Sequence, residues 1–161
     1  MFARIALWSA LAFLLNLAWE TAHVRLYTLW DASSGPVIAA ALFHCSLGDM
    51  LIALAMYAVA GLALRRADWP AARPWAGSAI VVVGATAFTA WSEGYNVYGA
   101  GNWAYSASMP LIFGLGLSPL VQWIVLPPAI VLACRTMEPS LQVARGTSEP
   151  ISAHERFEER T

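Results

Sequence analysis

Four long apolar segments constrain this chain more than any other feature. They run from about Ile5 to Val24, Val37 to Leu64, Pro74 to Val97 and Pro110 to Cys134. A helix needs about 20 residues to cross the hydrocarbon core of a membrane, and each segment reaches that length. Only 12% of the 161 residues are charged, about half the share found in soluble domains. The sequence therefore excludes a soluble globule and predicts an all-α polytopic membrane protein, a four-transmembrane-helix bundle.

The charged residues separate this membrane domain from a tail. Residues 1–137 hold the four apolar segments, whereas residues 138–161 combine charged side chains with Pro139 and Pro150 and show no apolar periodicity. Such a composition cannot bury enough apolar surface to fold by itself. The sequence therefore predicts a four-helix transmembrane domain over 1–137 and a disordered cytoplasmic tail over 138–161.

The arginines predict how the helices are oriented. The termini and the loop between the second and third segments carry Arg4, Arg65, Arg66, Arg73 and Arg135. The two remaining loops carry only Arg25. Positive charge is retained on the cytoplasmic side of a membrane. We therefore expect both termini to be cytoplasmic and loops 25–36 and 98–109 to face outward, in a bacterial-type inner (plasma) membrane.

Aromatic residues and prolines add two local predictions. Tryptophan and tyrosine concentrate at membrane interfaces. This preference predicts an inner interface at Trp8, Trp69 and Trp75, and an outer one at Tyr27, Trp30, Tyr98, Trp103 and Tyr105. A proline inside a helix removes a backbone donor. The fourth segment is therefore expected to kink near Pro119 and to be strained again at Pro127 and Pro128.

Polar side chains within the apolar segments point to a site. In the first segment Asn16, Glu20 and His23 are spaced by four and three, which places them on one helical face. The other segments add His44, Asp49, Glu93, Asn96 and Gln122. Helical rise puts the ionisable groups of three segments in the outer half of the membrane. Since ionisable groups in lipid are costly, this shared depth predicts one polar site facing into the bundle.

Three carboxylates in one site must be neutralised. Glu20, Asp49 and Glu93 can be compensated by a bound cation, by protons retained on the carboxyl groups, or by Arg25 folding back over them. Each remedy implies a different function.

A metal is one hypothesis for the site. Glu20 and His23 form Glu-x-x-His, the spacing by which one helix of a di-iron bundle presents two ligands. Together with His44 and Glu93 they would hold a divalent metal, zinc or iron. Haem between His23 and His44 fits less well, because helical rise separates the two residues by about 7 Å in depth.

Acid–base catalysis without a metal is the other hypothesis. A carboxyl group in an apolar cavity can hold a proton, and a neighbouring imidazole can accept one. The candidate catalytic residues are Glu20, His44, Asp49 and Glu93. A pocket for an apolar substrate would be lined by Asn16, Trp19, Trp91, Tyr95, Asn96, Trp103, Tyr105 and Gln122.

These patterns support two functional hypotheses. The first is a small membrane enzyme or ligand-binding protein that acts on a lipophilic small molecule, with a metal as a candidate aid. The alternative is an accessory or assembly subunit of a membrane complex that holds a cofactor or a partner helix, or that forms a homo-oligomer. Nucleic acid is not expected as a partner, since the chain has no basic patch with interleaved aromatic residues. The enzyme hypothesis further predicts that Glu20, His44 and Glu93 face one another.

Overall fold

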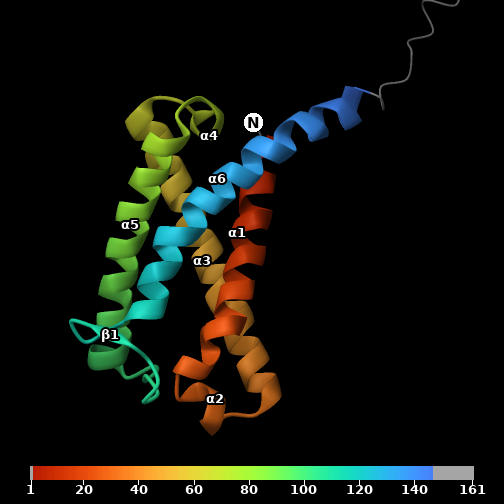
Figure 1. Ribbon diagram of the computed structural model, residues 1–161. Coiled ribbons are helices and arrows are strands. Elements are labelled where there is room, and N and C mark those ends of the chain that lie inside the picture. Colours follow the sequence, from red (N-terminus) through yellow and green to blue (C-terminus); the bar gives the residue numbers. More distant parts are fainter. Residues whose placement is uncertain (1, 147–161) are drawn as a thin grey trace, which may run out of the picture.

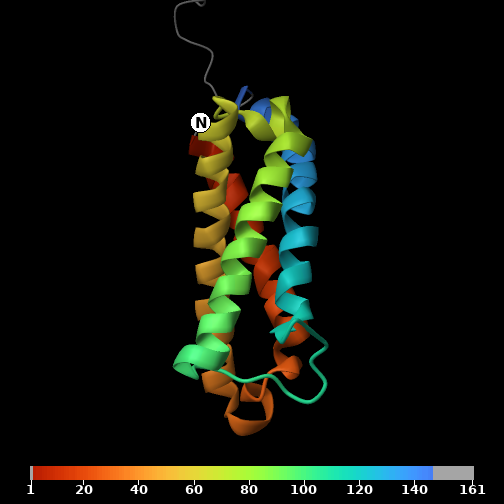
Figure 2. The same cartoon turned by 90° about the vertical axis from the view of Figure 1, so that its left-hand side faces the viewer.

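Four long helices form the molecule, as the apolar segments predict. The structure is a computed structural model that describes the backbone of residues 2–146 and the side chains of residues 2–137. The helices are α1 (Phe2–His23), α3 (Gly35–Leu64), α5 (Pro74–Gly94) and α6 (Leu117–Gly146). Each packs against two others, in the cyclic order α1, α3, α5, α6 (Figures 1 and 2). The stretches long and apolar enough to cross a membrane are Phe2–Leu26, Gly35–Leu64, Pro74–Ala100 and Leu117–Met137.

The short elements gather at the two ends of the bundle. Helix α4 (Trp69–Ala72) lies at the same end as the N-terminus, which we call the α4 end (Figure 1). The opposite end, called the hairpin end, holds the 3-10 turn η1 (Val24–Leu26), α2 (Leu29–Ala32), the π-helix η2 (Tyr95–Ala100), β1 (Leu111–Ile112) and β2 (Leu115–Gly116).

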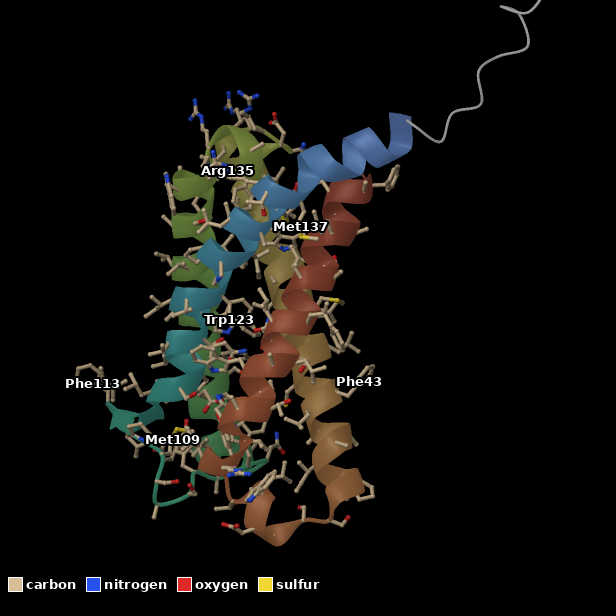
Figure 3. All side chains as sticks on the ribbon, turned by 45° about the vertical axis from the view of Figure 1, so that its right-hand side comes forward. Phe43, Met109, Phe113, Trp123, Arg135 and Met137 are labelled. Carbon is tan, nitrogen blue, oxygen red and sulfur yellow. The ribbon has the colours of Figure 1, made fainter. Side chains whose placement is uncertain are left out.

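The fourth helix starts later than the sequence predicts. Residues 111–116 form an antiparallel hairpin in which Leu111 pairs with Gly116 and Ile112 with Leu115. Phe113 and Gly114, at the turn, have positive φ angles of 50° and 81°. Two successive left-handed residues are incompatible with a right-handed helix, so α6 can begin only after the hairpin. Apolar composition alone does not reveal this turn. Phe113 is 99% exposed and points away from the bundle (Figure 3).

Helix α6 also differs from the prediction at its prolines and its end. Pro119 lies in the first turn, where backbone N–H groups have no acceptor within the helix, so it causes no kink. The helix continues to Gly146, although the composition predicts disorder from Glu138. Extending an existing helix requires no new nucleus, which explains how a polar segment can follow the last span. Residues 147–161 of the predicted tail lie outside the described residues.

Aromatic packing fills the α4 end of the bundle. Trp8 and Trp69 are both 0% exposed, so their rings face the interior of the bundle and not the lipid. Their rings lie 5.4 Å apart and both contact the ring of Tyr57. Each indole N–H donates to a carbonyl on α3, Trp8 to Ala53 at 3.2 Å and Trp69 to Tyr57 at 3.1 Å. Because every polar atom of the two indoles is satisfied, these large rings can be buried at little cost.

We expect Gly77→Ala to destabilise this packing. A β-carbon at Gly77 would overlap the ring of Trp69, which is held on its other side by Trp8. Overpacking of this kind costs about 1–3 kcal/mol. Unfolding in mixed micelles, followed by tryptophan fluorescence, measures the loss. Gly48→Ala is the control, because a β-carbon at Gly48 meets nothing within 4 Å. Equal stability of the Gly77 variant and the parent would contradict the packing argument.

Candidate functional site

The inward face of α1 lines a polar cluster in the hairpin half of the bundle. Its buried residues Trp8, Ala12, Asn16 and His23 recur at helical spacing, with the partly buried Trp19 between the last two. Facing α6 contributes Gln122, which is 1% exposed. The predicted helical face of the first segment is therefore the one that turns inward.

The deeper part of the cluster is an amide and carboxylate network. The side-chain nitrogen of Gln122 donates to Asn16 Oδ1 at 2.6 Å and to Asp49 Oδ2 at 2.9 Å. One amide thereby uses both its hydrogens to join α6 to α1 and α3. Asn16 in turn donates to the carbonyl of Ala12 at 2.7 Å. These bonds give Asn16, Asp49 and Gln122 partners within the protein.

Nearer the hairpin end, Glu93 is buried and is bound by two tyrosines. Tyr105 donates to Glu93 Oε2 at 2.5 Å, and Tyr27 lies 3.4 Å from the same oxygen. Glu93 is 6% exposed. Burial, and next the charge of Glu93, raises the pKa of the Tyr27 hydroxyl above its ordinary value. Burial and the bond to Glu93 raise the pKa of Tyr105 likewise, so both phenols keep their protons and remain donors.

The loops of the hairpin end hold the two tyrosines in place. Tyr27 and Tyr105 form an isolated antiparallel bridge, and their rings lie 5.7 Å apart. On either side of this bridge, the N–H of Thr28 donates to Ala104 at 3.0 Å and the N–H of Ser106 donates to Leu26 at 2.9 Å. Segments nearly eighty residues apart in sequence are therefore tied across the end of the bundle.

Beside these tyrosines, the hydroxyl of Ser118, the imidazole of His23 and the carboxylate of Glu20 form a chain of contacts. Ser118 Oγ lies 2.8 Å from His23 Nδ1. The other ring nitrogen, Nε2, lies 3.2 Å from Glu20 Oε1. The His23 ring also packs edge-on against Tyr27, with centroids 5.6 Å apart. His23 thus connects α1 to the first turn of α6 and lies against the tyrosine that faces Glu93.

The charges of the cluster are close enough to interact. Asp49 interacts electrostatically with Glu20 and Glu93, and Glu93 interacts with Glu20 and His23. Arg25 does not fold over the carboxylates as one hypothesis required. Its guanidinium lies over the ring of Trp30, 4.9 Å from the centroid. The basic group in contact with the cluster is therefore His23.

The structure assembles most of the predicted site but not all of it. It brings together Asn16, Glu20, His23, Asp49, Glu93, Tyr105 and Gln122. His44 is exposed on α3, which contradicts the expectation that it faces Glu20 and Glu93. That segment is apolar on all sides, so its periodicity identifies no inward face.

Three residues predicted to line a substrate pocket lie elsewhere. Trp91 and Tyr95 are 63% and 56% exposed and stack on each other, with centroids 5.9 Å apart. Asn96 donates to the Ser92 carbonyl at 2.8 Å and accepts from Asn102 at 2.6 Å. These three residues order the C-terminal turns of α5 and the π-helix after it.

No metal cluster is present in the part of the chain that the structure describes. Among those residues, no three His, Cys, Asp or Glu side chains converge as metal ligands. The predicted set of Glu20, His23, His44 and Glu93 is not assembled, because His44 lies on an exposed surface. Haem ligation by His23 and His44 is not supported for the same reason.

Sequence reasoning misses two members of the cluster. The aromatic pattern places Tyr27 at the membrane interface, yet its hydroxyl turns inward to Glu93. The sequence identifies Ser118 only as a polar residue of the fourth span, whereas the structure places it in the first turn of α6, in contact with His23. The Ser-Pro pair at 118–119 is a signal of a helix start that could have located it.

Two buried indole donors remain without a partner. Within the described residues, Trp19 Nε1 and Trp103 Nε1 are buried and make no hydrogen bond. Trp19 lies on the inward face of α1 between Asn16 and His23. The hydroxyls of Ser78 and Thr86 on α5 are likewise buried and unpartnered among the described residues, so such groups are not confined to the cluster.

Comparison of the chain with protein-family models, with curated proteins and with solved structures gives no match.

We expect Tyr105→Phe to destabilise the protein by about 1–3 kcal/mol, because it leaves an oxygen of buried Glu93 without its 2.5 Å donor. Unfolding in mixed micelles measures the difference. Tyr95→Phe is the matched control, since the Tyr95 hydroxyl is exposed and makes no hydrogen bond to the described residues. If both variants lose the same stability, the bond to Glu93 does not support the hairpin end.

Proposed function

We propose that this chain is a small enzyme of a bacterial-type inner membrane that transfers protons to and from a lipophilic substrate at its hairpin end. The observation that carries the proposal is the grouping of three mutually interacting carboxylates, Glu20, Asp49 and Glu93, with His23 in contact with Glu20. Polar groups that only join helices do not require three interacting carboxylates, each of which is costly to place in hydrocarbon.

The members of the cluster supply complementary steps of proton transfer. His23 can accept a proton at one ring nitrogen while the other faces Glu20. Glu93 is held in a fixed orientation by Tyr105 and Tyr27. A fixed carboxyl group in an apolar surrounding is suited to give or take a proton without rearrangement of solvent. Asp49 lies deeper and accepts a hydrogen bond from Gln122.

The surroundings of the cluster suit an amphipathic substrate. The hairpin end holds polar groups, among them the buried indole N–H groups of Trp19 and Trp103, which have no acceptor among the described residues. An apolar portion can remain in the lipid beside the bundle, since the outward-turned surface of α6 includes Leu117, Ile124, Val125 and Leu132. A substrate that places a polar head at the hairpin end and an apolar tail along α6 would be a membrane lipid or a similar lipophilic molecule.

Isotopes from solvent test the proposal even though the substrate is not specified. Purified protein is incubated with membrane lipids of its native host in D₂O and, separately, in H₂¹⁸O. In at least one lipid, the parent protein is expected to incorporate deuterium at a carbon atom or an ¹⁸O atom from water. Glu93→Gln is expected to reduce that rate by about 100-fold or more, the usual contribution of a general acid or base. Mass spectrometry of the extracted lipids measures both labels.

Asp31→Asn is the control for this experiment, because Asp31 is an exposed carboxylate on α2 at the same end of the bundle. It should match the parent protein. Absence of both labels with the parent protein, or equal rates with Glu93→Gln, would refute the enzyme and favour an accessory subunit.

The arginine distribution further supports a hairpin end that faces outward and termini that face the cytoplasm. In a variant lacking Cys45 and Cys134, Ser108→Cys is expected to react with a membrane-impermeant maleimide in intact cells. Ala71→Cys, exposed at the opposite end, should react only after lysis. The reverse pattern would show the opposite orientation.

A further inference from the structure

We infer that Ser118 is a nucleophile for acyl transfer, with His23 as its general base and Glu20 as the residue that positions His23, and that the substrate is a carboxylic ester with an apolar acyl chain. This inference rests on the proposed function, since it specifies the substrate class of the same site. Its basis is the contact of Ser118 Oγ with His23 Nδ1 at 2.8 Å and of His23 Nε2 with Glu20 at 3.2 Å.

The direction of proton flow follows from the chemistry of the three groups. An ionised Glu20 can only accept, so the ring nitrogen facing it carries the hydrogen. The other nitrogen, Nδ1, is then left with its lone pair toward Ser118. A serine hydroxyl facing an imidazole lone pair, with a carboxylate behind the imidazole, is the arrangement that activates a serine. The two ring nitrogens exchange roles relative to the familiar serine protease triad.

The reaction balances with water as the only co-reactant. Ser118 Oγ attacks the ester carbon and forms a bond to it, while its proton passes to His23 Nδ1. The C–O bond to the alcohol then breaks, and the alcohol leaves with that proton. Water attacks the acyl-serine, gives a proton to His23, and the proton returns to Ser118 Oγ as the acid departs. One ester and one water yield one acid and one alcohol.

The surroundings of Ser118 fit such a reaction. Ser118 is partly exposed, so a carbonyl group can reach it. Glu93 interacts electrostatically with His23 and stabilises the imidazolium that forms during attack.

Depth in the membrane selects a lipid ester. The first candidate span ends at Leu26 and the fourth begins at Leu117. By helical rise, His23 and Ser118 lie within about 5 Å of these boundaries. The ester groups of membrane lipids lie at this same boundary between hydrocarbon and head groups. An acyl chain reaching down from there would lie along the exposed apolar residues of α6, which include Ile124 and Val125.

A long-chain alkyl fluorophosphonate tests the inference on the full-length protein in detergent. This probe phosphonylates an activated serine and releases fluoride. We expect the parent protein to be labelled at Ser118, as located by peptide mass spectrometry, and Ser118→Ala to remain unlabelled. His23→Ala should slow labelling about 100-fold or more. Added imidazole should restore part of that rate, which it would not do if His23 only held α1 to α6.

Controls separate reactivity from folding. Ser106→Ala removes another serine of the hairpin end, bonded to Ser108 at 2.8 Å, and should label as the parent does. Glu20→Gln should slow labelling, and Glu20→Asp should recover part of the loss. If Ser118→Ala does not fold, Ser118→Cys transfers the test to alkylation by iodoacetamide, which should depend on His23 in the same way. Labelling that is absent, or located on another residue, would overturn the inference.

The two proposals can fail independently. If lipids gain deuterium in a Glu93-dependent reaction while Ser118 is not phosphonylated, proton transfer stands and the ester substrate is wrong. If Ser118 is phosphonylated but no lipid gains either isotope, the serine is activated and the lipid reaction proposed for the site is wrong. Hydrolysis of a lipid ester requires both Ser118 labelling and ¹⁸O in the released fatty acid.

Discussion

A bundle surrounded by hydrocarbon has no solvent for its interior polar groups, so these groups depend on partners inside the chain. Gln122 shows how this requirement organises the fold. Its single amide bonds to Asn16 and Asp49 and so fixes α6 against α1 and α3 at one depth. Loss of that register would leave several buried polar groups unpaired at once. The interior hydrogen bonds therefore fix the positions of the helices relative to one another, while the apolar side chains fill the space between the helices.

The two ends of the bundle meet this requirement in different ways. At the α4 end, the indole N–H groups of Trp8 and Trp69 donate to backbone carbonyls, so the polar atoms of both rings are hydrogen-bonded. At the hairpin end, carboxylates are held by tyrosines and a histidine, and the donors of Trp19 and Trp103 stay unpaired among the described residues. At the α4 end, Ser78 Oγ in the first turns of α5 is also buried without a partner among the described residues. The two ends therefore differ in the kind of group that they bury, aromatic rings at the α4 end and ionisable side chains at the hairpin end.

The sequence predicts the elements better than the contacts between them. Length and apolarity are sufficient for four helices, and spacing by three and four is sufficient to turn Asn16 and His23 inward. Composition cannot reveal the hairpin at 111–116, because its residues are as apolar as a span. The inward turn of Tyr27 depends on pairing with Tyr105, nearly eighty residues away, and no local pattern records such a contact. The prediction for His44 is wrong because α3 has no polar face to orient it.

The length of α3 has a consequence for the surrounding bilayer. Its 30 residues extend about 45 Å at 1.5 Å per residue, against a hydrocarbon core of about 30 Å. An upright α3 is therefore longer than the core, so it must tilt or project into the head groups. Because α1 and α5 pack against α3, a tilt of α3 tilts these two helices as well.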